Sequence, residues 1–318
     1  MCDDNTEADL DRLIHQEKLT RRTFNTLTAG AAVSVILPNT SSAAAFTEQE
    51  VTASTPDEDA TVAEQETAIG TPDEDATVTE KEVTVGTPDG DADAYFVHPA
   101  KGRSPGVILW PDIFGLRPAF RQMGKRLAES GYAVLVVNPY YRTATSPVVA
   151  EGEDRRKVFK MAQTLSAETT TTDAKAFVTW LDNQESVDST RRIGTMGYCM
   201  TGPFTIRTAA AVPDRVGAAA SFHGGGLVTD SDSPHLLIKD TEAEFLIAIA
   251  DNDDQRSPEV KEILKQTFED TGKTAEVEVY KGAMHGWCAL DSRAYNQEAA
   301  DRAWARLLVL LERTLVQG

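Results

Sequence analysis

Residues 193–202 read IGTMGYCMTG, and this segment constrains the architecture of the whole chain. It begins as a short apolar run typical of a buried strand and passes through Gly-Tyr-Cys-Met-Thr-Gly into a stretch of helical composition. A sharp strand-to-helix turn of this kind presents its central side chain, here Cys199, at the end of the strand. The N-terminus of the following helix carries partial positive charge and unpaired N–H groups, which favour a thiolate over a thiol. We therefore identify Cys199 as a candidate nucleophile.

The sequence around this segment alternates between short apolar runs and amphipathic stretches. Such alternation is typical of parallel β-α-β units. We predict an α/β fold with a doubly wound, mostly parallel sheet, helices on both faces and ligands at the carboxyl ends of the strands. The expected strands are residues 107–110, 133–138, 193–198, 216–222, 245–250 and 277–280, and the expected helices are residues 119–130, 153–184, 204–211, 258–271 and 294–315.

Two later strand ends carry further candidate catalytic groups. The run Asp-Asn-Asp-Asp at residues 251–254 follows one apolar run, and His285 follows the last one. A carboxylate at such a position can orient a histidine and stabilise its charged form. The order along the chain is therefore nucleophile, acid and histidine, which is the order found in α/β-hydrolases.

With these features the sequence resembles the dienelactone hydrolase (carboxymethylenebutenolidase) family of α/β-hydrolases over residues 87–315. The matching landmarks are PDIFG at residues 111–115, GYA at 131–133, NPY at 138–140, the Gly-Tyr-Cys turn and GAMHG at 282–286. The combination is specific, because a cysteine in this turn together with the Ile-Phe-Gly loop is unusual among α/β-hydrolases. The resemblance implies a cysteine hydrolase that cleaves an ester or lactone without a metal or an organic cofactor.

The resemblance also implies roles for individual residues. It assigns Cys199 as the nucleophile, His285 as the base and acid, and Asp253 as the residue that orients His285. Asp253 is favoured because it stands third in the turn after its strand, but Asp251 and Asp254 remain alternatives.

Three positions near the nucleophile follow from the same resemblance. The backbone N–H groups of Ile113 and Met200 are the implied oxyanion donors. Asp112 occupies the position of an acid that hydrogen-bonds the resting thiol, although the family usually has glutamate there. The alternative is that Asp112 only forms the turn after a proline. Thr201 stands where a second glycine is common, so we expect it to pack there or to tilt the helix.

The implied substrate contacts match the family only in part. Arg155 corresponds to a carboxylate-binding residue, but Phe159 replaces a tyrosine and Ala289 replaces a second arginine. The resemblance therefore indicates the reaction class rather than the dienelactone substrate. Three strand-end residues are further candidates to line the pocket: Tyr140, His223 and Trp287.

The first ninety residues have a different character. A twin arginine at residues 21–22, a short apolar run and an alanine-rich stretch predict a twin-arginine export signal over residues 1–45. A 16-residue unit then occurs twice, at residues 55–70 and 71–86, with 11 of 16 positions identical. Because the copies are acidic and poor in large apolar residues, we expect residues 46–86 to form a disordered linker. The catalytic domain is then residues 87–318.

The charge distribution limits the partners. The formal net charge is −19, and residues 46–93 hold fifteen carboxylates against one lysine, so the remaining domain is nearly neutral. Phosphate backbones would repel such a chain, which argues against nucleic acid as a partner. The three cysteines are too scattered for a disulfide framework or a zinc site. We expect an exported, periplasmic protein, with a cytoplasmic location as the alternative. We expect it to have no stable membrane anchor once the signal is removed and to be monomeric or a small homo-oligomer.

The function that we predict is hydrolysis of a small-molecule ester or lactone through a thioester on Cys199. Two alternatives remain open: an exported binding protein that keeps the fold without activity, and a thiol acyltransferase. The sequence does not separate water from another acyl acceptor, because both would use the same catalytic groups.

Overall fold

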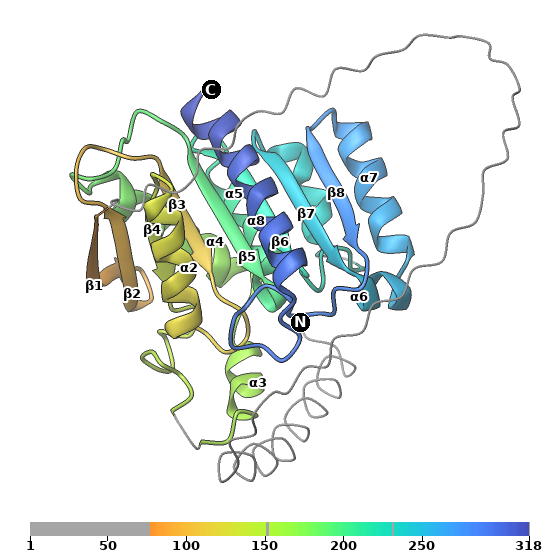
Figure 1. The fold of residues 1–318 in the computed structure, drawn as a ribbon, viewed down its shortest axis with the longest axis horizontal. Helices are drawn as coiled ribbons and strands as arrows, with labels where there is room; N and C mark the ends of the chain where they lie inside the picture. The colour runs from red at the N-terminus through yellow and green to blue at the C-terminus, as the bar shows by residue number, and fades with distance from the viewer. Residues whose placement is uncertain (1–76, 151–152, 231, 318) are drawn as a thin grey trace, which may run out of the picture. The chain divides into compact units, whose positions relative to one another are not determined.

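The structure is a computed structural model, and it describes residues 77–150, 153–230 and 232–317. The predicted export signal at residues 1–45 and the first part of the predicted linker, residues 46–76, lie outside the described residues. Within the described part, the chain forms one eight-stranded sheet in the order β1-β2-β4-β3-β5-β6-β7-β8 (Figure 1).

The sheet is parallel from β4 to β8, while β1 and β2 are antiparallel to their neighbours. The predicted doubly wound, mostly parallel α/β architecture is therefore confirmed. The strands are β1 (Val78–Thr87), β2 (Gly90–Pro99), β3 (Gly106–Trp110), β4 (Ala133–Val137), β5 (Ile193–Tyr198), β6 (Val216–Phe222), β7 (Glu244–Ala250) and β8 (Ala275–Tyr280).

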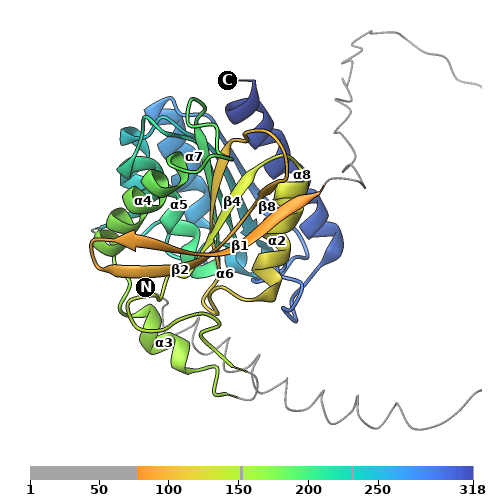
Figure 2. The same cartoon turned by 90° about the vertical axis from the view of Figure 1, so that its left-hand side faces the viewer.

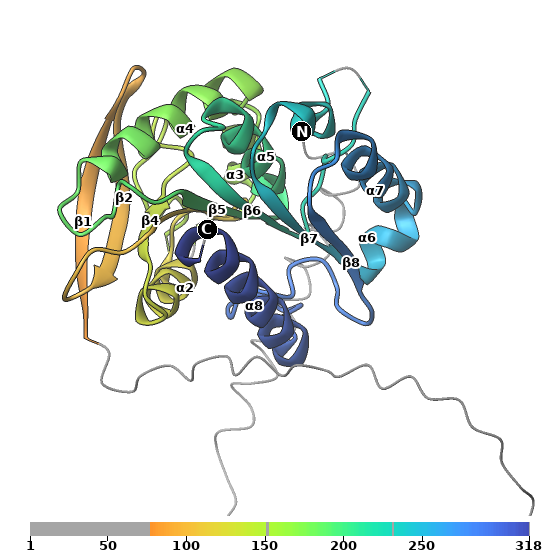
Figure 3. The same cartoon turned by 90° about the horizontal axis from the view of Figure 1, so that it is seen from above.

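Helices cover both faces of the sheet, as Figure 3 shows most clearly. The side chains of α2 and α8 form one hydrophobic core with the strands, and those of α4, α5 and α7 form a second core on the opposite face. The strands in the middle of the sheet are buried on both faces, which explains why they read as continuous apolar runs. The helices are α2 (Pro118–Glu129), α3 (Lys157–Ala162), α4 (Ala167–Asp182), α5 (Gly202–Ala211), α6 (Asp251–Arg256), α7 (Glu259–Thr271) and α8 (Gln297–Leu311).

Strand β1 corrects the predicted domain boundary. Most of the second repeat copy, assigned above to the linker that ends at residue 86, is this edge strand, which pairs with β2 along its whole length (Figure 2). Val85 is fully buried opposite Ala92. Glu80, on the exposed side, accepts a hydrogen bond from the Tyr95 hydroxyl at 2.7 Å. An edge strand needs apolar residues on one face only, so its acidic composition concealed it.

Two helices also differ from the prediction. The expected helix over residues 153–184 is two helices, α3 and α4, because Ser166 caps the start of α4. The Ser166 hydroxyl accepts the backbone N–H of Thr169 at 3.1 Å, and the Thr169 hydroxyl accepts the backbone N–H of Ser166 at 2.8 Å. The polar run after β7 is not a turn but α6. Across the described residues, every helix is too short or too polar to cross a bilayer.

Candidate active site

Cys199 lies at a sharp turn between β5 and α5. Its φ of +56° is in the left-handed region, which a non-glycine residue adopts only when the surroundings impose it. The turn depends on close backbone approach: a Cβ on Gly202 would lie 2.5 Å from the Cα of Gly224, and a Cβ on Gly197 would lie 2.4 Å from the carbonyl oxygen of Thr201. The local sequence thus fixes the strained conformation that presents the cysteine. Only 8% of Cys199 is exposed.

Thr201 packs into the turn. Its buried hydroxyl accepts the N–H of Tyr198 at 3.0 Å and lies 2.9 Å from the carbonyl oxygen of Trp110 on β3. Because a hydroxyl can accept one hydrogen bond while donating another, Thr201 links the end of β5 to the neighbouring strand β3. Of the two outcomes expected for a threonine here, packing is the one observed.

His285 and Asp253 come together at the carboxyl ends of β7 and β8. Nδ1 of His285 lies 2.7 Å from Oδ2 of Asp253, and both side chains are partly buried. The two other acids in the Asp-Asn-Asp-Asp run have other partners. Asp254 contacts Lys261 at 2.7 Å, and Asp251 accepts the backbone N–H of Gly282 at 3.0 Å. Of the three candidates left open by the sequence, Asp253 is the one that contacts the histidine.

The charge around His285 favours its protonated form. Burial lowers the pKa of His285, but the electrostatic and hydrogen-bond interactions of its ring with Cys199 and Asp253 outweigh this effect and hold the pKa well above its usual value. Nε2 of His285 is buried and has no hydrogen-bond partner of good geometry among the described residues. Such contacts are often loose before substrate binds. The site therefore favours the imidazolium form of His285.

The carboxylate of Asp112 is held by Arg117 and by the loop that follows β3. Its two carboxylate oxygens accept hydrogen bonds from Arg117 at 2.6 and 2.9 Å, and one of them also accepts the N–H of Phe114 at 2.9 Å. Burial lowers the pKa of Arg117, but the carboxylates of Asp112 and Asp291 outweigh it and raise that pKa. Aspartate, one methylene shorter than glutamate, closes the loop that follows β3. These contacts fit the alternative, a turn residue, and the role beside the thiol stays a prediction.

This loop carries the first expected oxyanion donor. Among the described residues, no acceptor is found for the backbone N–H of Ile113, and its carbonyl accepts the Tyr140 hydroxyl at 2.8 Å. Met200, the second expected donor, is the second residue of a short helical turn that begins at Cys199. The first N–H groups of a helix have no partner within the helix. The side chains of Ile113, Met200 and Tyr140 belong to one small apolar cluster.

The predicted substrate contacts divide into two groups. Arg155 and Phe159 are partly exposed, and both approach Phe114: the Arg155 guanidinium lies 3.9 Å from the Phe114 ring centre, and Phe159 shares its apolar cluster. Phe114, which contacts both, stands in the Ile-Phe-Gly loop and was not singled out from the sequence. No group of three or more His, Cys, Asp or Glu side chains in the described ranges is arranged to hold a metal ion.

The other three predicted contacts are buried. Tyr140, His223 and Trp287 are at most 2% exposed, and their contact with substrate stays a prediction. The ring of His223 packs edge-on against His285 at 4.8 Å, and Trp287 packs against His223 at 5.1 Å. The position of a residue at a strand end does not determine which way its aromatic side chain points. These three side chains are packed inside the protein.

Comparisons with known proteins agree with this fold and identify the family. The sequence model of the dienelactone hydrolase family matches residues 92–315. A "Putative carboxymethylenebutenolidase" of Synechocystis sp. is 28% identical over 70% of this chain and 91% of its own length. The carboxymethylenebutenolidase of Rhodococcus opacus is 27% identical over 68% and 84%. Among solved structures, a "Putative Dienelactone Hydrolase" from Klebsiella pneumoniae superposes with a TM-score of 0.67 at 24% identity, covering 74% of this chain and 99% of that one.

Proposed function

Because the chain belongs to the dienelactone hydrolase family, we propose that it hydrolyses an ester or lactone through a thioester formed on Cys199. The observation that carries the proposal is the 2.7 Å contact between Asp253 and His285, on a histidine whose pKa the charge of Cys199 raises. A thiolate and an imidazolium held together in this way are the two groups that acylation requires.

In the first half of the reaction, the thiolate sulfur attacks the carbonyl carbon. A C–S bond forms, and the negative charge moves to the carbonyl oxygen. The N–H groups of Ile113 and Met200 stabilise this oxyanion; one such donor is typically worth about 100-fold to 1000-fold in rate. The C–O bond then breaks, and the His285 imidazolium gives its proton to the leaving oxygen. The products are a thioester on Cys199 and an alcohol or enol.

In the second half, neutral His285 removes a proton from water. The hydroxide attacks the thioester carbon, the C–S bond breaks, and the carboxylic acid leaves. Cys199 returns as the thiolate and His285 as the imidazolium. Asp253 keeps the imidazole oriented throughout, because its carboxylate holds Nδ1.

The chemistry of the nucleophile indicates the class of substrate. A stabilised thiolate is itself a good leaving group, so the tetrahedral intermediate goes forward most readily when the leaving oxygen is also a stable anion. Enol esters, enol lactones and aryl esters meet this condition, whereas amides do not. The relatives named carboxymethylenebutenolidases support an unsaturated lactone within this class.

The test is acylation of the purified chain by p-nitrophenyl acetate. Mass spectrometry of the quenched mixture should show a transient mass increase of one acetyl group on Cys199, with release of p-nitrophenol. The Cys199→Ala variant should show neither, while Cys288→Ala, the matched control for the second buried cysteine, should keep both. Absence of acetylation and turnover in the wild type would instead favour a binding protein. A stable adduct released only by added thiols or alcohols would favour an acyltransferase.

A further inference from the structure

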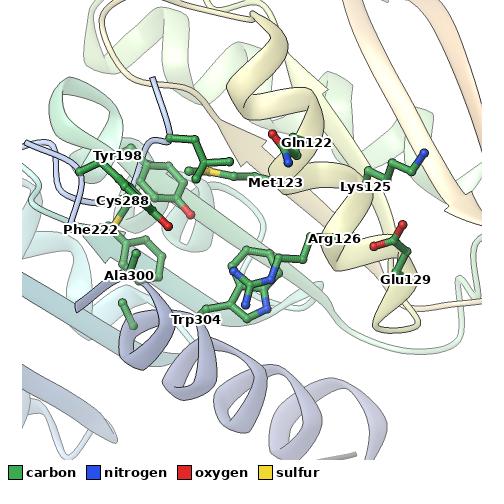
Figure 4. Close-up of a pocket in the computed structure, with 13 residues that line it drawn as sticks. Gln122, Met123, Lys125, Arg126, Glu129, Tyr198, Phe222, Cys288, Ala300 and Trp304 are labelled. Carbon is green, nitrogen blue, oxygen red and sulfur yellow. The ribbon is translucent and has the colours of Figure 1, made fainter. Parts of the chain in front are cut away.

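A cavity of about 540 Å³ lies on the helix face formed by α2 and α8. Figure 4 shows its lining: Tyr198, Phe222 and Cys288 lie on one side, and Arg126 and Trp304 on the other. Neither Cys199 nor His285 lines it. Successive residues of a strand point to opposite faces of a sheet, so Tyr198 faces away from the side where its neighbour Cys199 acts. The cavity is therefore separate from the candidate active site, and its volume is that of a small-molecule site.

The floor of the cavity is aromatic. Tyr198 and Phe222 stack with their ring centres 4.9 Å apart, and both line the cavity. Tyr198 is 2% exposed. Burial raises the pKa of Tyr198, so the phenol stays protonated and its hydroxyl can donate a hydrogen bond.

A cation lies opposite this hydroxyl. The guanidinium of Arg126 lies 4.5 Å from the ring centre of Trp304, and its carboxylate partner Asp301 is 3.4 Å away, with both side chains about half exposed. Exposed ion pairs of this kind contribute little free energy. The neighbouring rim cation, Lys125, is held by Glu80 at 2.8 Å instead.

We infer that this cavity binds a small aromatic carboxylate that does not react there. The ring would lie on the Tyr198 and Phe222 surface, and the carboxylate would accept hydrogen bonds from the Tyr198 hydroxyl and the Arg126 guanidinium. Aromatic stacking suits the floor, and the donors and the cation select an anion over a neutral analogue. This inference concerns a second site and does not depend on the proposed hydrolysis.

The probe is 2-naphthoate, titrated into the full chain by isothermal titration calorimetry, with uncharged 2-naphthamide as the matched ligand. We expect 2-naphthoate to bind at least about tenfold more tightly than the amide, because a hydrogen bond to a charged group is worth more than one to a neutral group. The Cys199→Ala variant should bind it unchanged. Loss of binding in Cys199→Ala would place the ligand in the catalytic site and overturn the inference.

Variants of the lining separate this site from weak association elsewhere. Arg126→Gln should weaken the binding of 2-naphthoate about tenfold. Lys125→Gln, one residue away and paired with Glu80, should change the affinity less than about twofold. Tyr198→Phe removes only the hydroxyl and should also weaken the binding of 2-naphthoate. Ala300→Leu, on α8, should block the cavity. Equal affinities for the acid and the amide, or equal effects of the Arg126 and Lys125 variants, would overturn the inference. Thermal unfolding of each variant verifies that it is folded.

Discussion

Oδ2 of Asp253 lies 2.7 Å from Nδ1 of His285, while the next residue, Asp254, turns into the protein and contacts Lys261. Two adjacent acids on α6 therefore have separate tasks. One faces the histidine at the carboxyl end of the sheet, and the other joins α6 to α7. This separation makes the choice of the orienting acid directly testable.

Asp253→Asn should lower kcat by about 10³-fold to 10⁴-fold, because the amide cannot stabilise the imidazolium or hold its tautomer. Asp254→Asn is the matched control. It should lower kcat less than about tenfold and lower the free energy of unfolding by about 1–3 kcal/mol, because Lys261 loses a buried partner. Steady-state kinetics and urea unfolding measure the two effects. A larger kinetic effect from Asp254 would assign the role to that residue.

The raised pKa of His285 predicts the alkaline behaviour of the enzyme. Since the pKa is held well above 6.5, the imidazolium persists through neutral pH, and kcat/KM should decline only as pH rises past that raised value. In Cys199→Ala the anion is gone and burial still lowers the pKa, so the value should fall. An NMR titration of the His285 ring in both proteins measures the shift. An unchanged midpoint would mean that the thiol is protonated or distant.

Asp112 and Arg117 should act as a unit that closes the loop carrying Ile113. We expect Asp112→Ala and Arg117→Ala to lower kcat/KM by similar factors, and the double variant to show a coupling free energy of about 1–2 kcal/mol in unfolding. If Asp112 instead ionises the thiol, Asp112→Ala will lose activity while Arg117→Ala keeps it. Comparing the two single variants decides between these roles.

Close backbone contact at the cysteine turn predicts the effect of one methyl group. Gly202→Ala would bring a Cβ within 2.5 Å of the Gly224 Cα and the Ser221 hydroxyl, so the backbone must shift. We expect a loss of about 1–3 kcal/mol in unfolding free energy, together with lower activity. Gly225→Ala, where a Cβ meets nothing within 4 Å, should stay within about 0.5 kcal/mol of wild type. Equal unfolding midpoints would contradict the predicted strain.

The sequence predicted the parallel strands well for a physical reason. Strands covered on both faces must be apolar throughout, so each stands out between polar segments. The same rule failed at the sheet edge, where β1 buries one face only, and at α6, whose Asp-Asn-Asp-Asp run has the composition of a turn. Acidic residues also suit the first turn of a helix, where they face its positive end.

The site was predictable where chain position decides which groups meet. Cys199, the acidic tetrad and His285 follow strands whose ends share one edge of the sheet. The contacts that surround each group were harder to predict from the sequence. Whether Asp112 faces a thiol or an arginine depends on the path of a loop, and whether Trp287 lines a cavity or fills a core depends on which way its ring turns.

The edge strand β1 has a practical consequence for anyone who prepares shorter forms of this protein. A chain started at residue 87, where composition alone would put the boundary, would lack this strand and leave the backbone of β2 without its neighbour. Tyr95 and Val97 would then lie beside unpaired backbone amide and carbonyl groups. Such an open strand edge promotes self-association. Starting at or before residue 77 retains the acidic strand that shields them.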